Sequence, residues 1–341
     1  MIRSRTMARL SIIGSALMFL TASAVLPLRA DDEILPINSR LISHFKVGSD
    51  QTRFGAFEFV GGLELSSPSA ALGAMSAIRL SADRQSFLGV MDTGFWYAGR
   101  FERGPDGQLI GIADFSVSPI LDAEGESSKQ KWRVDAEGMA VRGDEVLVSF
   151  ERRSRVDVYP AKAPGRSIPL GSLPVQIPLE ELRNNRGLEA IMVAPSASPL
   201  SGEVVAVSEK SLNASGDIYA AVLTGPSKGV FFVKRHAPYD VTDGDFLPNG
   251  DLLLLERRFS IAEGIGMRIR RIDGSRLGPG NLVDGEVVLE ADFGEQIDNM
   301  EGLDVSTDDA GQTFVTLVSD DNHSILQRNL MLEFRYLGDA K

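Results

Sequence analysis

Short apolar runs, rich in Val, Leu, Ile and Phe, recur along almost the whole chain, and polar turn residues separate them. Most runs are about four to seven residues long, and Gly, Pro, Asn or Asp bounds them. Such runs are typical of β-strands rather than helices. The turns at residues 105–107, 142–144 and 248–251 each lie between two runs and contain Gly or Asn, which tolerate positive φ angles. The pattern therefore predicts an all-β protein built from hairpins.

Five of the runs belong to a longer repeat, in which a polar turn precedes the run and an acid ends it. One residue near the start of each copy marks the repeat: Ser76, Glu137, Glu189, Asp243 and Glu301. Successive marks are 61, 52, 54 and 58 residues apart, and the first copy is degenerate. A period of this length indicates a radial or solenoid array.

Four antiparallel strands with their hairpins need roughly 40 to 50 residues, which is the size of one propeller blade. Five copies occupy most of the chain, and the strands expected around residues 40–65 and 326–337 could pair as a closing blade. We therefore expect a single β-propeller domain over residues 31–341. Six blades are the preferred number, and five or seven are possible. A β-sandwich is the alternative, but it would not explain the period.

The first thirty residues have the pattern of an export signal. Three arginines form a basic start, residues 10–20 are apolar, and residues 22–24 or 28–30 offer a cleavage site. The apolar stretch is shorter than the about 20 residues that a membrane span needs, and an uncleaved anchor is the alternative. No later segment approaches that length. We expect a mature chain that is periplasmic or secreted and has no membrane span.

Composition narrows the classes of partner. The net charge is -12, and removal of residues 1–30, which hold four arginines and no acid, makes it -16. Such a surface repels nucleic acid, whose binding needs clustered Lys and Arg. The chain has no cysteine, which excludes disulfides, thiolate metal sites and a cysteine nucleophile. We expect a monomer that binds a small molecule and no nucleic acid.

If each run forms a blade strand, the repeated acids lie at equivalent positions around a central channel. Carboxylates that face one cavity raise each other's proton affinity or require a cation. Ca²⁺, which takes six to eight oxygen ligands, is the simplest such cation. The predicted metal ligands are Glu137, Glu189, Glu301, Asp320 and Asn299. The alternative is that the acids of the Glu-Gly turns accept backbone N–H bonds from the next blade and have no catalytic role.

Three runs end on an acid that a base follows directly: Glu151 and Arg152, Glu209 and Lys210, and Glu256 and Arg257. Adjacent strand residues point to opposite faces, so the acid and the base of a pair cannot both line the same wall unless a bulge intervenes. We assign Glu256 as a general base, and Arg152, Lys210 and Arg257 as groups that neutralise developing negative charge. The structural alternative is that one member of each pair faces the channel while the other caps a neighbouring blade.

At these residues the chain resembles the exported phytase-like family, described as having esterase-like activity of phytase. The matching motifs are residues 135–138, 186–190, 253–259, 299–303 and 318–322. The resemblance covers about residues 55–337, and the first copy departs from the pattern at residues 61–64 and 91–94. It implies a β-propeller and suggests hydrolysis of phosphate or carboxylic esters. The chain has no run of lysines and arginines of the kind that would hold a highly phosphorylated inositol.

We therefore expect an exported hydrolase of phosphate or carboxylic esters whose channel carboxylates hold Ca²⁺. A bound cation would supply Lewis-acid polarisation of the ester or phosphoryl oxygen and a more acidic water. The alternative is a non-catalytic periplasmic binding or scaffold propeller of the same fold, with its acids satisfied by backbone donors.

Overall fold

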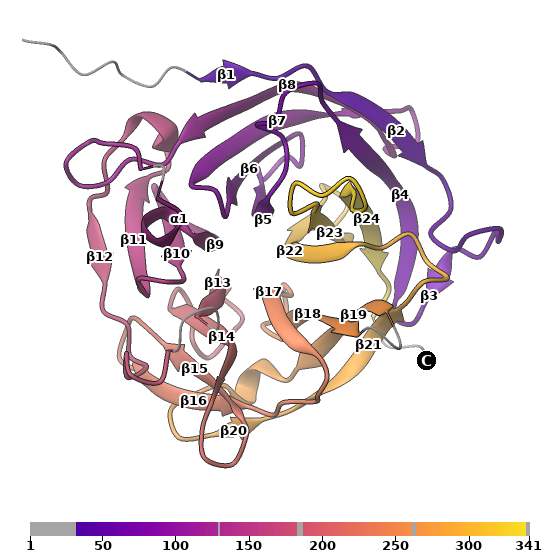
Figure 1. The fold of residues 1–341 in the computed structure, drawn as a ribbon. Helices are drawn as coiled ribbons and strands as arrows, with labels where there is room; N and C mark the ends of the chain where they lie inside the picture. The colour runs from indigo at the N-terminus through magenta and orange to yellow at the C-terminus, as the bar shows by residue number, and fades with distance from the viewer. Residues whose placement is uncertain (1–31, 129, 183–186, 261–263, 339–341) are drawn as a thin grey trace, which may run out of the picture.

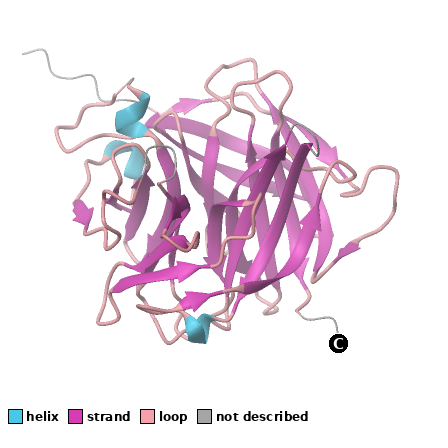
Figure 2. Cartoon of the chain, turned by 60° about the horizontal axis from the view of Figure 1, so that its bottom comes forward, coloured by secondary structure: helices cyan, strands magenta, loops and turns pink. Residues whose placement is uncertain are grey.

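The computed structural model describes residues 32–128, 130–182, 187–260 and 264–338. The predicted export signal, residues 1–30, lies outside the described residues. Within the described ranges, no helix has both the length and the apolar character that a membrane crossing requires. The helical segments in these ranges are short, namely α1 (Lys131–Val134), η1 (Pro164–Arg166) and η2 (Gly274–Arg276) (Figure 2).

Five sheets form blades around a central axis (Figure 1), which confirms the predicted β-propeller. Blade 1 contains β1 (Glu33–Ile34), β5 (Met75–Leu80), β6 (Ser86–Met91), β7 (Phe95–Arg103) and β8 (Leu109–Pro119). Blade 2 contains β9 (Ala136–Arg142), β10 (Glu145–Phe150), β11 (Arg155–Pro160) and β12 (Gly171–Leu173). Blade 3 contains β13 (Leu188–Val193), β14 (Val204–Leu212), β15 (Ile218–Val222), β16 (Gly229–Val233) and β20 (Leu282–Val283). Blade 4 contains β17 (Asp240–Phe246), β18 (Leu252–Ser260), β19 (Gly264–Ile272) and β21 (Gly285–Ala291). Blade 5 contains β2 (Asn38–Ile42), β3 (Arg53–Phe54), β4 (Phe57–Ser66), β22 (Asn299–Thr307), β23 (Thr313–Asp320) and β24 (Asn329–Tyr336).

Blade 5 combines strands from the N-terminal and C-terminal parts of the chain and closes the ring. β4 pairs antiparallel with β24, from Phe57 opposite Tyr336 to Leu65 opposite Asn329. The strands expected near the two ends therefore do pair, but they join the sheet of the fifth repeat instead of making a sheet of their own. The fifth repeat supplies only β22 and β23, and these need neighbours to complete a blade. The count is thus five, within the predicted range and below the preferred six.

The strands nearest the axis are the first strands of the repeats, β5, β9, β13, β17 and β22 (Figure 1). Each contacts the corresponding strands of the two neighbouring blades. The next strand of each blade is covered on both faces, because a blade packs between two others. In β18, all four residues from Leu252 to Leu255 are fully buried. Burial on both faces explains why the chain shows continuous apolar runs and not strict alternation.

One arginine spans the channel partway along its length. The Arg79 guanidinium on β5 donates hydrogen bonds to the carbonyls of Ile191, Gly244 and Leu303, on the inner strands of blades 3, 4 and 5. It also pairs with Asp243 of β17, with an Nη1–Oδ2 distance of 3.1 Å. Asp243, the expected mark of the fourth repeat, is fully buried in this ion pair. Arg79 therefore separates the two mouths of the channel.

Candidate functional site: a carboxylate-lined pocket

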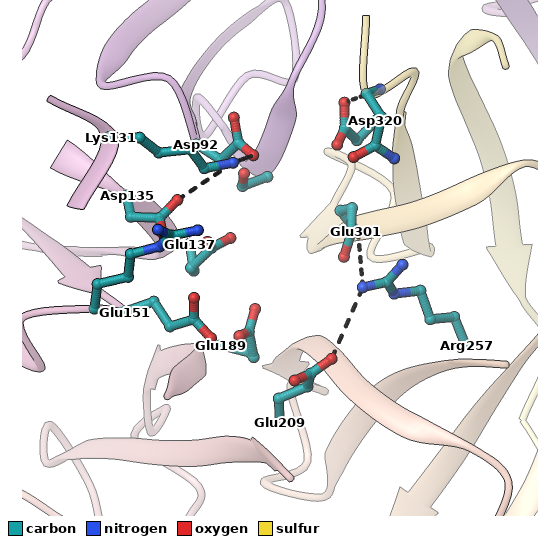
Figure 3. A pocket seen from close by; sticks show the side chains of 13 residues that line it. Asp92, Lys131, Asp135, Glu137, Glu151, Glu189, Glu209, Arg257, Glu301 and Asp320 are labelled. Atoms are coloured by element: carbon teal, nitrogen blue, oxygen red, sulfur yellow. Dashed lines mark hydrogen bonds and ion pairs between the residues drawn. The ribbon is translucent and has the colours of Figure 1, made fainter. Parts of the chain in front are cut away.

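A cavity of about 230 Å³ lies at one mouth of the channel, and every blade contributes to its lining (Figure 3). The lining residues are Ser76, Asp92, Lys131, Asp135, Glu137, Glu151, Arg152, Glu189, Glu209, Arg257, Glu301, Asp320 and Asn322. None of them has an apolar side chain. We call this cavity the carboxylate pocket.

A shift in the strand pairing occurs at the same place in each inner strand, and it positions the pocket side chains that the inner strands supply. The strand pairing skips one residue at Ser76, Glu189, Thr242 and Glu301, and blade 2 has the corresponding shift around Glu137. A β-bulge of this kind redirects a side chain that regular pleating would place on a blade face. The true equivalent in blade 4 is therefore Thr242, one residue before the predicted mark. Its hydroxyl is buried and donates to the Met300 carbonyl oxygen, so it does not line the pocket.

The end of the second strand of each blade supplies the other pocket side chains. Backbone pairing places five residues at equivalent positions, each opposite the residue two before the bulge: Asp92, Glu151, Glu209, Arg257 and Asp320. Four are acids, and blade 4 carries Arg257 instead. The structure thus brings most of the repeated acids together from all parts of the chain.

Glu256 lies outside the pocket, on the opposite face of β18. Its side chain is 1% exposed, and Oε1 accepts a hydrogen bond of 2.6 Å from Arg270 Nη2. Oε2 pairs with Arg268 Nε. The expectation that Glu256 faces the channel as a general base is therefore wrong, because the position that faces the channel in blade 4 belongs to Arg257.

Of the other three predicted catalytic residues, two line the pocket and one does not. Arg257 and Arg152 line the pocket, and Arg152 Nε donates to Asp135 Oδ2 at 2.8 Å. Lys210 does not line it, because its ammonium group pairs with Asp240. The prediction for the place of Lys210 is therefore wrong as well.

Four of the predicted metal ligands, Glu137, Glu189, Glu301 and Asp320, line the pocket. Asn299, the fifth, lies behind Glu301, where its Nδ2 donates to Glu301 Oε1 at 2.7 Å and its Oδ1 accepts from Arg257. Figure 3 shows Glu137 and Glu189 on one side of the pocket, and Glu301 on the other.

Among the described residues, the pocket lining holds more negative than positive groups, eight carboxylates against three cationic side chains. Arg257 Nη2 lies 3.3 Å from Glu301 Oε1 and 3.8 Å from Glu209 Oε1. Lys131 lies between Asp92 and Asp135, 3.5 Å from Asp135 Oδ1. These contacts leave several carboxylates without a cationic partner.

The pKa values of the pocket carboxylates reflect this excess. Burial raises the pKa of Glu137 and of Glu189 well above the usual range, and the neighbouring carboxylates raise it further. Burial also raises the pKa of Glu151 and of Glu301 to about 7. Within the described part of the chain, neither Glu137 nor Glu189 accepts a hydrogen bond or forms an ion pair. These two side chains are therefore the least compensated acids of the site.

The carboxylates fit a hard cation. Oxygens of Asp135, Glu137 and Glu151 lie within 4.8 Å of one another, and so do oxygens of Glu151, Glu189 and Glu209. Ligands at 2.3–2.6 Å from one Ca²⁺ can be at most about 5 Å apart, so both groups are compact enough. Asp135 Oδ1 is buried and accepts no hydrogen bond from the described residues, and its contact with Lys131 Nζ is an ion pair of 3.5 Å.

Comparison with protein families gives one match. The model described as "Phytase-like: Esterase-like activity of phytase" matches residues 70–323, more than two thirds of the chain. The chain belongs to the phytase-like family. The match begins just before β5 and ends just after β23, so it includes the inner strands of all five blades of this phytase-like propeller. No curated protein matches the chain. The family suggests a hydrolase-type propeller.

Five residues that line the pocket of this phytase-like chain are not among the ligands and reacting groups predicted from the sequence: Asp92, Lys131, Asp135, Glu151 and Glu209. The repeat contained the signal for three of them, because Asp92, Glu151 and Glu209 end their runs as Asp320 does. Asp135 belongs to the same turn as Glu137. Lys131, on the short helix α1, has no counterpart in the other repeats and left no signal.

Proposed function

We propose that this protein is a hydrolase of phosphate or carboxylic esters that acts with a divalent cation, Ca²⁺, in the carboxylate pocket. The observation that carries the proposal is the pair Glu137 and Glu189, two acids that line the pocket and form no hydrogen bond or ion pair among the described residues. Such a pair is costly in an empty pocket and favourable around a cation. Membership of the phytase-like family supports hydrolysis as the reaction class.

The proposed cation-holding residues are Asp135, Glu137, Glu151, Glu189 and Glu209, because their oxygens form the two compact groups. A bound cation would supply Lewis-acid polarisation of the substrate's oxygen. Its positive charge would also remove the mutual repulsion of the carboxylates, so that all five could be ionised at neutral pH.

Glu301 and Arg257, across the pocket, are the proposed reacting groups of the protein. Glu301 lies outside the two compact groups, and its pKa of about 7, raised by burial, suits a general base at neutral pH. In this role its carboxylate takes a proton from water while the water oxygen bonds to the carbonyl carbon or phosphorus. The bond to the leaving alcohol oxygen then breaks, and that oxygen receives the proton. Arg257 would donate N–H groups to the developing negative charge, and Asn299 holds both side chains in place.

The proposal includes export and a monomeric state. Residues 1–30 support export through their basic start and apolar stretch, and the acidic mature chain suits an exported protein. A single chain supplies every residue that lines the pocket, so the proposed reaction does not require a second copy.

Calorimetric titration of chelator-treated protein with Ca²⁺, together with turnover of 4-nitrophenyl phosphate and short 4-nitrophenyl esters, tests the proposal. We expect Ca²⁺ to release heat and to restore turnover. The double variant Glu137→Gln with Glu189→Gln should lose both while it keeps a cooperative thermal transition. Glu102→Gln is the matched control, because Glu102 is exposed and far along β7 from the pocket.

A second variant addresses the base. Glu301→Gln should bind Ca²⁺ but lose about 10²- to 10⁴-fold in kcat. Heat of Ca²⁺ binding without turnover of any ester would favour the non-catalytic binding propeller. Absence of both heat and turnover would exclude the proposed chemistry altogether.

A further inference from the structure

A second cavity, of about 710 Å³, lies beside the carboxylate pocket between blades 4 and 5. Its apolar wall consists of Phe259, Ile265, Phe293, Ile297 and Leu326. We call it the apolar cavity. Its volume lies in the range of small-molecule sites, about 300–1,000 Å³.

The wall of this cavity holds apolar side chains that the fold leaves in solvent. Among the described residues, the four most exposed large apolar side chains are Ile325 at 101%, Leu326 at 87%, Phe259 at 78% and Phe293 at 68%. Three of them line the apolar cavity, and Ile325 is adjacent to Leu326 in sequence. Exposed apolar surface that is gathered in one place, and not scattered, marks a binding site.

Local backbone structure holds one of the aromatic rings. Gly264, at the start of β19, has a φ of +69°, and a Cβ there would lie 1.6 Å from the Phe293 ring. The ring of Phe293 therefore packs directly on the backbone of Gly264. A side chain at residue 264 would occupy the space that this ring fills. This contact holds the exposed ring of Phe293 against the sheet and limits its movement.

The apolar cavity and the carboxylate pocket share two residues, Arg257 and Asn322. Among the residues that the structure describes, none with an apolar side chain lines the carboxylate pocket, whereas five line the apolar cavity. A ligand that extends across Arg257 would thus have a polar end among the carboxylates and an apolar end against Phe259 and Phe293.

We propose that the apolar cavity binds the acyl chain of a carboxylic ester, so that the ester group lies beside Arg257. This inference rests on the proposed hydrolysis and narrows its substrate class. A neutral ester is favoured over a phosphate monoester because, among the described lining residues, the eight carboxylates outnumber the three cationic groups by more than the two charges of one Ca²⁺, an excess that repels a dianion. Hydrolysis adds water across the acyl C–O bond and releases a carboxylic acid and an alcohol.

Acyl-chain dependence of turnover tests the inference. Glycerol monoesters from acetate to octanoate keep the alcohol constant and polar, and acid release can be followed by pH-stat in the presence of Ca²⁺. We expect kcat/KM to rise about three- to fourfold per methylene until the cavity is filled. The double variant Phe259→Ser with Phe293→Ser should flatten this rise, so that turnover of the octanoate ester falls far more than turnover of the acetate ester. Leu170→Ser is the control, because Leu170 is 64% exposed but does not line the cavity.

A binding measurement separates this inference from the proposed function. N-(2-hydroxyethyl)octanamide is a neutral amide counterpart of the ester, and its affinity can be measured by calorimetry without turnover. If no ester is hydrolysed, the proposed function fails, but tenfold or greater loss of amide binding in the double variant still supports an acyl site. Equal chain-length dependence in the wild type and double variant overturns the inference. So does a result in which the double variant loses only binding to lipid vesicles, since the patch would then be a membrane contact.

Discussion

Replacement of Arg79 by methionine tests whether the arginine across the channel stabilises the propeller. The wild-type guanidinium makes six hydrogen bonds, four to backbone carbonyls and two to Asp243. Arg79→Met keeps much of the side-chain volume but removes every donor. Asp243 retains the backbone N–H of Leu303, at 2.9 Å, and becomes a buried carboxylate without a counter-charge.

Loss of one partner from a buried ion pair costs about 3–5 kcal/mol. For about 300 described residues, the entropy of unfolding is roughly 0.6 kcal/mol per kelvin. The expected fall in Tm is therefore about 5–8 °C, provided that unfolding is a single transition. Scanning calorimetry and urea unfolding of the same samples give the two measurements.

The loss should depend on pH. Burial raises the pKa of Asp243 to about 6 in the wild type, and the Arg79 charge opposes that rise. Without Arg79, the pKa of Asp243 rises further above its value of about 3.9 in the unfolded chain. The folded state then binds the proton more tightly, so stability falls as pH rises through the folded pKa. Arg79→Met should thus lose less stability at pH 5 than at pH 8.

The double variant Arg79→Met with Asp243→Asn is the control, because it removes the buried charge together with its partner. It should be more stable than Arg79→Met at pH 8 and should show a weaker pH dependence, part of which remains because Arg79 also lowers the pKa values of Asp245 and Asp304. A single variant within about 1 kcal/mol of the wild type would show that Arg79 does not stabilise the propeller. The same loss at both pH values would show that the uncompensated charge of Asp243 is not the cause of the loss.

Three further predictions concern the acids. Glu256→Gln should cost about 3–5 kcal/mol in urea unfolding, because two buried arginines lose their carboxylate, while kcat/KM per folded molecule stays unchanged; loss of turnover alone would restore Glu256 as a catalytic group. In cation-free protein, the free energy of unfolding should fall as pH rises through 7. The reason is that the pKa values of Glu151 and Glu301 are about 7 in the folded state and about 4.3 in the unfolded chain. A free energy of unfolding that stays constant between pH 6 and 8 would contradict this expectation. Chelation should lower Tm, and Ca²⁺ at 100 times its Kd should add about 2.7 kcal/mol to the free energy of unfolding and weaken that pH dependence; an unchanged Tm after chelation would count against a resident cation.

The sequence repeat was sufficient to predict the class of fold and six of the thirteen residues that line the pocket. Marks at Glu137, Glu189 and Glu301 fell on the same bulge in three blades, so their spacing along the chain corresponded to rotation about the axis. The blade number could not be read in the same way. Pairing of β4 with β24 joins segments that are far apart in sequence, and no local pattern specifies which sheet they enter.

Blade 4 shows the limit for individual side chains. Sequence alignment of the repeats placed Glu256 with the acids at the other strand ends, but the backbone pairing places Arg257 there. A shift of one residue moves a strand side chain to the opposite face. The same shift separates Thr242 from Asp243. Bulge position depends on contacts between strands, so an acid in an apolar run could not be assigned to the pocket from its neighbours alone.

The pairing of β4 with β24 also determines when the carboxylate pocket can exist. During synthesis, blades 1 to 4 can gain their strands in chain order, but the ring stays open until β24 has emerged and reached β4. Every blade contributes to the pocket, so its acids cannot assemble on a nascent chain that lacks this strand. The complete pocket can therefore bind a cation only after β24 has been synthesised and has paired with β4. Loss of β24 is expected to abolish cation binding, even though β24 supplies none of the described lining residues.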